Sequence, residues 1–122
     1  LQLRRTADGS EGVNVTYEGG CSASGLVVST MSKDPLSQGQ QVRKAPSVPT
    51  VPGVQYSLRV FVDKSVIEAH LGTPAVVRSV TTRHYPLNLD AKSGAFGLAV
   101  MNAAAMEVVV ESVEVWGMRG IY

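Results

Sequence analysis

The feature that most constrains this chain is a pair of runs in which apolar and polar residues alternate on either side of a polar corner. The first run covers residues 56–63 and places four apolar side chains on one face: Tyr56, Leu58, Val60 and Val62. The second covers residues 66–71 and opposes Ile67, Ala69 and Leu71 to Val66, Glu68 and His70. A side-chain period of two is typical of half-buried β-strands. With the short corner Asp63-Lys64-Ser65 between them, the two runs predict a tight antiparallel hairpin.

Further strands are predicted elsewhere in the chain, separated by clusters of Gly, Pro, Ser, Asn and Asp. They lie at about residues 12–17, 25–31, 75–84, 95–101 and 106–116. Short strands at this spacing predict an all-β fold, an antiparallel β-sandwich of the jelly-roll or lectin-like kind. In the last strand the valines change parity between Val110 and Val113, so we expect a β-bulge near Glu111-Ser112.

A chain of 122 residues has the size of one domain, and we expect residues 1–122 to form a single sandwich. Residues 32–53 hold four of the six prolines. Proline removes ladder donors, so this stretch is predicted to be an extended surface crossing or a sheet edge. A linker is the alternative, but strands on both sides favour a long connection within one domain. The chain starts at Leu1 inside what reads as a strand, which predicts that the first strand or strands of the sandwich begin upstream.

Charge and cysteine content narrow the range of partners. Eleven Lys and Arg against ten Asp and Glu give a formal charge of +1, so the long-range field that nucleic acid or an anionic membrane needs is absent. No apolar run reaches the roughly 20 residues of a membrane-spanning helix, and no signal peptide is recognisable. The single cysteine, Cys21, cannot form an intrachain disulfide and has no basic neighbour that would activate its thiol. We therefore predict no nucleic-acid partner, no membrane partner and an inert thiol.

The residues that could carry chemistry are few and scattered. His70 and His84 have no ligand at metal-binding spacing beside them, so no metal site is predicted and both are interpreted as surface imidazoles. No Gly-x-Ser-x-Gly elbow and no phosphate-binding glycine loop occur. The sequence therefore predicts no cofactor and assigns no catalytic residue.

Asp63 and Glu68 are the best placed carboxylate pair, because they flank the hairpin corner. Two carboxylates on either side of a sugar bond are what glycosidases use. The alternative is structural: Asp63 would accept backbone N–H bonds at the corner around Lys64-Ser65, and Glu68 would pair with Arg59 or Lys64. Spacing alone favours the structural interpretation.

Two features could involve sugars. The triplet Asn14-Val15-Thr16 is an N-glycosylation sequon, which matters only if the protein enters a secretory pathway. Exposed aromatic rings could stack on sugar rings. The candidates for stacking are Tyr17, Tyr85 and Tyr122. The rings expected in core or edge packing are Tyr56, Phe96 and Trp116.

Four segments of the second half of the chain form an ordered series. They are residues 58–68 (LRVFVDKSVIE), 81–86 (TTRHYP), 96–103 (FGLAVMNA) and 109–118 (VVESVEVWGM). In this order they resemble the hairpin signature, the Ser/Thr-Arg-x-Tyr-Pro strand end, the penultimate strand with its turn, and the closing strand of one known module. This module is the C-terminal β-sandwich of invertases, the β-fructofuranosidases of glycoside hydrolase family 32. Before residue 58 the resemblance rests mainly on strand order.

The resemblance implies that catalysis belongs to a five-bladed propeller upstream of the sandwich. The catalytic motifs of that propeller are Asn-Asp-Pro-Asn, Arg-Asp-Pro and Glu-Cys, and none of them occurs intact in this chain. Lys33-Asp34-Pro35 imitates the second motif and Glu18-Gly19-Gly20-Cys21 faintly imitates the third. Both imitations fall in the wrong domain, so neither is given a catalytic role.

The same resemblance gives Asp63, Ser65 and Glu68 a structural role in the hairpin. The chain departs from the family at His70, where smaller or apolar residues are usual. It also departs at residues 101–104, which lack the glycosylation triplet often found at that turn. These departures concern the surface of the module and leave the expected fold unchanged.

The function that the resemblance implies is that of an accessory, non-catalytic C-terminal module of a sucrose- or fructan-cleaving hydrolase, acting in stability or oligomer contacts. The implied partners are the upstream propeller of the same protein and, as in some relatives, a second copy in a homodimer. One alternative is a free-standing lectin-like sandwich that binds glycans. Another is a structural interaction domain without any connection to sugars. The resemblance is compatible with an extracellular or vacuolar protein, and the sequence leaves the compartment open.

Overall fold

The computed structural model describes residues 1–3, 10–18, 25–33, 41–48, 51, 53–63, 65–85 and 109–117. Within these residues, all regular structure is β-strand. The strands are β1 (Gln2–Leu3), β2 (Gly12–Glu18), β3 (Gly25–Met31), β4 (Gln41–Lys44), β5 (Ser57–Asp63), β6 (Val66–Gly72) and β7 (Val77–Arg83). The predicted all-β class is confirmed.

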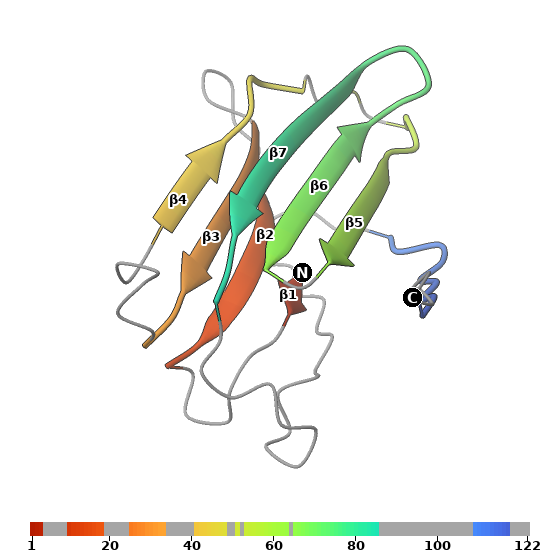
Figure 1. The fold of residues 1–122 in the computed structure, drawn as a ribbon. Coiled ribbons are helices and arrows are strands. Elements are labelled where there is room, and N and C mark those ends of the chain that lie inside the picture. Colours follow the sequence, from red (N-terminus) through yellow and green to blue (C-terminus); the bar gives the residue numbers. More distant parts are fainter. Residues whose placement is uncertain are drawn as a thin grey trace.

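The strands form two sheets that lie face to face (Figure 1). The first sheet has the order β1-β2-β3-β4 and the second has the order β5-β6-β7. Every pair of neighbouring strands is antiparallel. Between the sheets, β7 contacts both β3 and β4. The architecture is therefore the predicted antiparallel β-sandwich.

The core lies between the two sheets and is aliphatic. Leu26 of β3 and Ile67 of β6 have no exposed surface, and each comes from an inner strand of its sheet. The other members of the core are Val13, Val15, Val28, Val48, Ala69, Leu71 and Val80. Fully burying a Val, Leu or Ile side chain contributes about 1.5–3 kcal/mol. The inward faces of the strands therefore supply the main force that holds the sheets together.

The predicted hairpin of residues 56–71 is confirmed. Strands β5 and β6 pair along their whole length and end with Asp63 opposite Val66, which leaves a corner of two residues. The inward face of β6 is buried as predicted: Ile67, Ala69 and Leu71. On the β5 side, three of the predicted residues pack against the core: Tyr56, Val60 and Val62. Leu58 is the exception and is 42% exposed, because β5 is an edge strand.

Other predicted strands also occur. Strand β3 has the predicted bounds, β2 ends one residue beyond the predicted end, and β7 lies inside the predicted range 75–84. Strand β4 is an edge strand, as the prolines of residues 32–53 predicted. The predicted strand at residues 95–101 lies outside the described residues.

The stretch that follows β4 stays on the first sheet in its described part. Residues 45–48 form no strand, but Val48 is only 1% exposed and belongs to the core. The hydroxyl of Tyr17 on β2 donates a hydrogen bond to the carbonyl oxygen of Val48 at 2.9 Å. These contacts tie the proline-containing stretch to the sandwich.

The strand predicted at residues 106–116 is wrong for the part that the structure describes. Residues 109–117 form neither strand nor helix, so the bulge predicted at Glu111-Ser112 is not found. Trp116 is 77% exposed, and the prediction that it packs in the core or at an edge is also wrong. In a strand, Val110 would point to one side of the sheet, and Val113 and Val115 would point to the other. Neither side of such a strand would therefore be apolar along its whole length. A hydrogen bond from Gln55 Nε2 to Glu111 Oε2 joins the segment to the residues just before β5.

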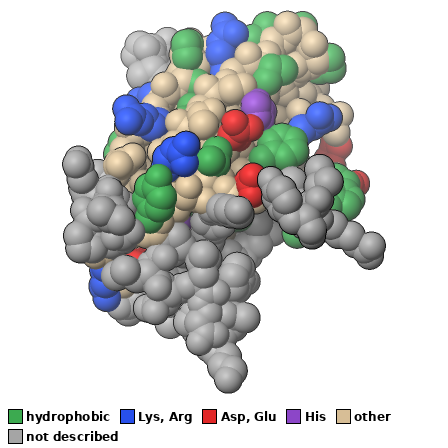
Figure 2. Space-filling model, in the orientation of Figure 1, with side chains coloured by type: hydrophobic (Ala, Val, Ile, Leu, Met, Phe, Trp, Pro, Cys, Tyr) green, Lys and Arg blue, Asp and Glu red, His purple; other side chains and the backbone are tan. Residues whose placement is uncertain are grey.

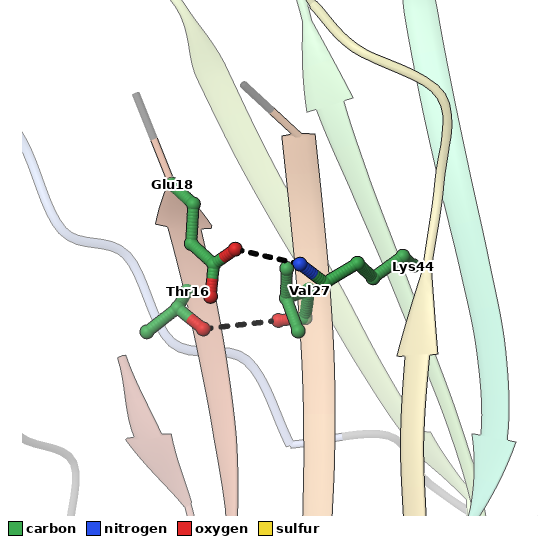
Figure 3. Close-up of polar contacts among 4 residues, drawn as sticks. All are labelled: Thr16, Glu18, Val27 and Lys44. Atoms are coloured by element: carbon green, nitrogen blue, oxygen red, sulfur yellow. Dashed lines mark hydrogen bonds and ion pairs between the residues drawn. The ribbon is translucent and has the colours of Figure 1, made fainter. Parts of the chain in front are cut away.

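On the side of the first sheet that faces away from the core, an ion pair spans three strands (Figure 3). Lys44 Nζ on β4 lies 2.8 Å from Glu18 Oε2 on β2, so the two side chains meet across β3. Beside this pair, Thr16 Oγ1 donates to the carbonyl oxygen of Val27 at 3.4 Å. Both charged side chains are more than half exposed, so the pair contributes at most about 1 kcal/mol. It orients the edge strand rather than holding the fold together.

The turn between β6 and β7 needs a residue without a side chain at Gly72. A Cβ atom placed on Gly72 would overlap the carbonyl oxygen of Val76 and lie 2.8 Å from the Cα of Val77. These atoms are held in place, because Thr73 and Val76 exchange backbone hydrogen bonds of 2.9 and 3.3 Å. The close approach of the two backbones therefore depends on glycine.

Gly72→Ala is expected to destabilise the protein by about 1–3 kcal/mol, because the added methyl group forces the turn backbone apart. Thermal unfolding measures this loss. Gly117→Ala is the matched control, since a Cβ there has nothing within 4 Å and the thermal midpoint should not change. Equal thermal midpoints for the two variants would contradict the close approach at Gly72.

Candidate functional site

Ser65, at the hairpin corner, connects the hairpin to the end of β7. Its carbonyl oxygen accepts a hydrogen bond from the backbone N–H of His84 at 2.7 Å. Its hydroxyl accepts a hydrogen bond from Nη1 of Arg83 at 3.2 Å. Two of the four segments that carry the family resemblance, the hairpin and residues 81–86, are thus in direct contact.

His84 is fully buried, and the prediction that it is a surface imidazole is wrong. Its Nε2 lies 3.1 Å from the carbonyl oxygen of Met31, which ends β3 in the other sheet. The next residue, Tyr85, accepts a hydrogen bond at its carbonyl oxygen from the hydroxyl of Ser32. Burial alternates without a break along residues 79–85, so His84 continues the inward face of Val80 and Thr82 just beyond the end of the ladder. His84 turns inward and helps to join the two sheets.

Buried polar residues gather at the strand ends near His84. Glu11, just before β2, is 2% exposed, and its Oε1 accepts a hydrogen bond from the backbone N–H of Lys33 at 3.3 Å. Thr30, Ser32 and Thr82 are also buried. Burying polar groups costs free energy unless they are hydrogen-bonded. The bonds of Glu11, Ser32 and His84 therefore hold this end of the sandwich in addition to apolar packing. The hydroxyl of Thr82 has no such bond within the described residues.

The second sheet carries a polar outer face with one exposed ring, and Figure 2 shows basic, acidic, apolar and histidine side chains side by side on it. Phe61 is 47% exposed and meets His70 edge-on, with ring centroids 5.7 Å apart. Nδ1 of His70 lies 2.7 Å from Ser79 Oγ, and its Nε2 lies 4.0 Å from Glu68 Oε2. His70 is therefore the centre of a small group of side chains drawn from all three strands.

Asp63 and Glu68 lie on this same outer face. Nε2 of His70 lies 4.0 Å from Oε2 of Glu68, and the predicted pairing of Glu68 with Arg59 is not found among the described residues. Asp63 is exposed. Lys64 lies outside the described residues, so the corner bonds expected of Asp63 stay a prediction. A glycosidase needs its two carboxylates on either side of an enclosed sugar bond. An exposed sheet face does not supply this enclosure, so the geometry favours the structural interpretation of the pair.

The sequence-based prediction does not place Phe61 on either face of its strand. Parity along β5 was the available signal, because position 61 shares its side of the strand with Ser57, Arg59 and Asp63. The predicted sugar-stacking rings lie elsewhere in the chain. Tyr17 is 39% exposed, Tyr85 is 36% exposed, and Tyr122 lies outside the described residues.

Asn14, the acceptor of the glycosylation sequon, lies in the middle of β2. It pairs with Gln2 of β1 on one side and with Ser29 of β3 on the other. Its neighbours Val13 and Val15 are buried in the core, so Asn14 lies on the outer side of the sheet and is half-buried. Its glycosylation stays a prediction.

Within the described part of the chain, no three side chains of His, Cys, Asp or Glu come together as a metal-binding group. Nor does any helix there have the length and apolar character needed to cross a membrane. Cys21 and the pair Asp34-Pro35, which belong to the imitations of propeller motifs, lie outside the described residues.

The fold and the contacts described above are those of an antiparallel β-sandwich module. It has two sheets, an aliphatic core and polar contacts at its strand ends. The sequence profile of one family, described as "Glycosyl hydrolases family 32 C terminal", matches residues 1–117. The chain therefore belongs to this family, as a C-terminal module of a family 32 glycoside hydrolase. The match confirms the resemblance and extends it over the residues before position 58.

One curated relative is the acid beta-fructofuranosidase of Solanum lycopersicum, which is 35% identical over 90 residues. The aligned region is 74% of this chain and 13% of that relative, so the chain spans a small part of the relative's length. No solved structure matches the chain.

His84→Ala is expected to lower the free energy of unfolding by about 2–5 kcal/mol, because it leaves a cavity and removes the contact with Met31. Denaturant unfolding measures the loss. His70→Ala is the control, since His70 is half-exposed on the outer face and its removal should cost about 1 kcal/mol or less. If the two variants were equally stable, the inter-sheet role of His84 would be refuted.

Proposed function

We propose that this chain is the accessory C-terminal β-sandwich of a β-fructofuranosidase-like hydrolase, which cleaves sucrose or fructans with a catalytic propeller in the same protein. The observation that carries the proposal is the family match over residues 1–117. The relative named acid beta-fructofuranosidase supports the substrate class. In this proposal residues 1–122 form one domain, and residues 32–53 are a connection within it.

The module itself is proposed to be non-catalytic. The intact propeller motifs are missing from its sequence. Asp63 is exposed, Glu68 lies against His70, and Ser65 is engaged with the end of β7. In this proposal the three hairpin residues stabilise the corner and its contact with β7, and none of them touches the substrate.

The proposed work of the module is to cover and stabilise a neighbouring domain. Residues 109–117 expose a run of apolar side chains, between 51% and 78% exposed: Val109, Val110, Val113, Val115 and Trp116. Removing apolar surface from water is favourable by about 25 cal/mol per Å², and contiguous exposed apolar surface marks contact sites. The propeller of the same protein is the proposed partner of this segment, and a second copy in a homodimer is the other candidate.

Asp63→Ala and Glu68→Gln, made in the intact parent enzyme, are expected to leave the turnover of sucrose unchanged, because neither carboxylate takes part in catalysis. Turnover and thermal midpoint are measured together. Glu18→Gln, which removes an exposed carboxylate from the other sheet, is the control. A loss of about a hundredfold or more in turnover at an unchanged thermal midpoint is the size expected for a catalytic carboxylate and would contradict the proposal.

The mass of the native product tests the parent protein directly. An antibody raised against the 122-residue chain is used to detect the product in its source cells. We expect a band several times heavier than 12.9 kDa that co-fractionates with sucrose-cleaving activity. A native product near 12.9 kDa would contradict the proposal that the chain is part of a larger hydrolase.

A lectin-like glycan-binding module is the second candidate function, and one observation favours it. The half-exposed ring of Phe61 is bordered by the polar groups of His70 and Glu68. An aromatic ring with flanking hydrogen-bonding groups suits the apolar and polar faces of a sugar. A native product near 12.9 kDa whose saturable binding of fructo-oligosaccharides is lost in Phe61→Ala would favour this candidate.

A further inference from the structure

A pocket opens at the edge of the sandwich, between β4 of the first sheet and β7 of the second. Its volume is about 310 Å³, and the described residues that line it are Gln41, Arg43, Thr81, Thr82, Arg83 and Tyr85. Strands β4 and β7 contact each other across the sandwich at this edge. Pockets of this size lie at the lower end of the range for small-molecule sites. The pocket therefore suits a ligand of few atoms.

The polar lining follows from the register of β4. Gln41 pairs with Thr30, and Arg43 pairs with Val28. Both partners on β3 are buried, and cross-strand partners lie on the same side of a sheet. Gln41 and Arg43 therefore lie on the core side of β4, where apolar residues are usual. At this edge a polar pocket takes the place of the apolar core.

The charged side chains that line the pocket in the described part of the chain are all positive. Arg43 and Arg83 both contribute to the lining, and the described lining residues include no Asp or Glu. Arg83 uses one of its nitrogens to donate to Ser65. The side chain of Arg43 makes no hydrogen bond or ion pair with any residue that the structure describes. A guanidinium group presents a planar fork of donors that matches the oxygens of a phosphate, sulfate or carboxylate.

Thr82 provides an independent observation that points to a ligand. Its side chain is 5% exposed, and its buried hydroxyl has no hydrogen-bond partner within the described part of the chain. A buried hydroxyl without a partner costs free energy. Thr82 lines the pocket, but its hydroxyl oxygen has less than 1 Å² of accessible surface, so the side chain must turn toward the opening before a bound oxyanion can satisfy it.

The wall of the pocket next to Thr82 is held in place from the other sheet. Tyr85 follows the fully buried His84, and its carbonyl oxygen accepts a hydrogen bond from the hydroxyl of Ser32. The backbone that carries Tyr85 is thus fixed to the end of β3. Such support keeps the lining groups in position before a ligand arrives.

We infer that this pocket binds a small oxyanion, either inorganic phosphate or the phosphate group of a small sugar phosphate. Arg43 and Arg83 supply the positive charge, and the hydroxyl of Thr82 donates a hydrogen bond. A neutral sugar fits less well, because it would leave both guanidinium charges uncompensated. The inference does not depend on the proposed accessory role, since it rests on the register of β4 and the lining of the pocket alone.

Isothermal titration of the intact protein with inorganic phosphate, at fixed ionic strength, tests the inference. Saturable binding at one site is expected, and Arg43→Gln should weaken it by about tenfold or more, as expected for the loss of a charge-assisted hydrogen bond. Arg43 is the main variant because its side chain has no bond within the described protein to lose. Arg59→Gln removes an exposed arginine on β5 and is the control. Absence of saturable binding, or an equal loss in both variants, would overturn the inference.

Thr82→Val gives a second test that does not change the charge. The substitution replaces the unpartnered hydroxyl by a methyl group of the same shape, so the thermal midpoint without phosphate should rise. The further rise that phosphate produces should be smaller than in the wild type. A fall in the midpoint without phosphate, or an undiminished effect of phosphate, would overturn the role of Thr82.

Glucose 6-phosphate and glucose, titrated under the same conditions, distinguish the source of the oxyanion. Binding of glucose 6-phosphate that is tighter than that of inorganic phosphate would assign the site to a sugar phosphate, and equal binding would assign it to the free ion. Glucose is expected not to bind. If glucose bound as tightly as its phosphate, the site would be a neutral sugar site and the inference would be wrong.

Discussion

Burial of the two inner sheet faces against each other is the constraint on which the rest of the structure depends. Leu26 and Ile67, from the two sheets, are both completely buried. A sheet of three or four short strands with one apolar face needs a cover to be stable in water. Each sheet is the cover of the other, so the strand positions at the edges and ends follow from this contact.

The polar contacts at the strand ends depend on that packing and in turn make it specific. Aliphatic side chains tolerate small displacements, whereas a buried hydrogen bond is lost when its partners move apart. The contacts of His84 with Met31 and of Ser32 with Tyr85 therefore select one alignment of β3 with β7. The same alignment places Arg83 beside β4, at the pocket.

The period of two was enough to predict the hairpin and the inward faces, because this part of the fold is encoded by neighbours along the chain. The burial of His84 follows the same period, because His84 has the parity of the buried residues Val80 and Thr82. The period does not predict its hydrogen-bond partner, since Met31 belongs to the other sheet. The polar inward face of β4 was also hidden. Gln41 and Arg43 look like surface residues in the sequence, and only their pairing with Thr30 and Val28 reveals that they lie on the core side.

At the candidate site, too, the sequence predicts the separate segments but not the contacts between them. The family resemblance located the hairpin and residues 81–86 as separate segments, but their meeting at Ser65 is a property of the folded chain. A module that served packing alone would gain stability from valine or leucine at positions 41 and 43, since each would extend the apolar core to the edge. Polar residues at these inward positions forgo that gain, and they place the guanidinium group of Arg43 beside that of Arg83 at an open pocket. The core and the pocket therefore follow different physical rules, with packing at the centre of the sandwich and binding chemistry at its edge.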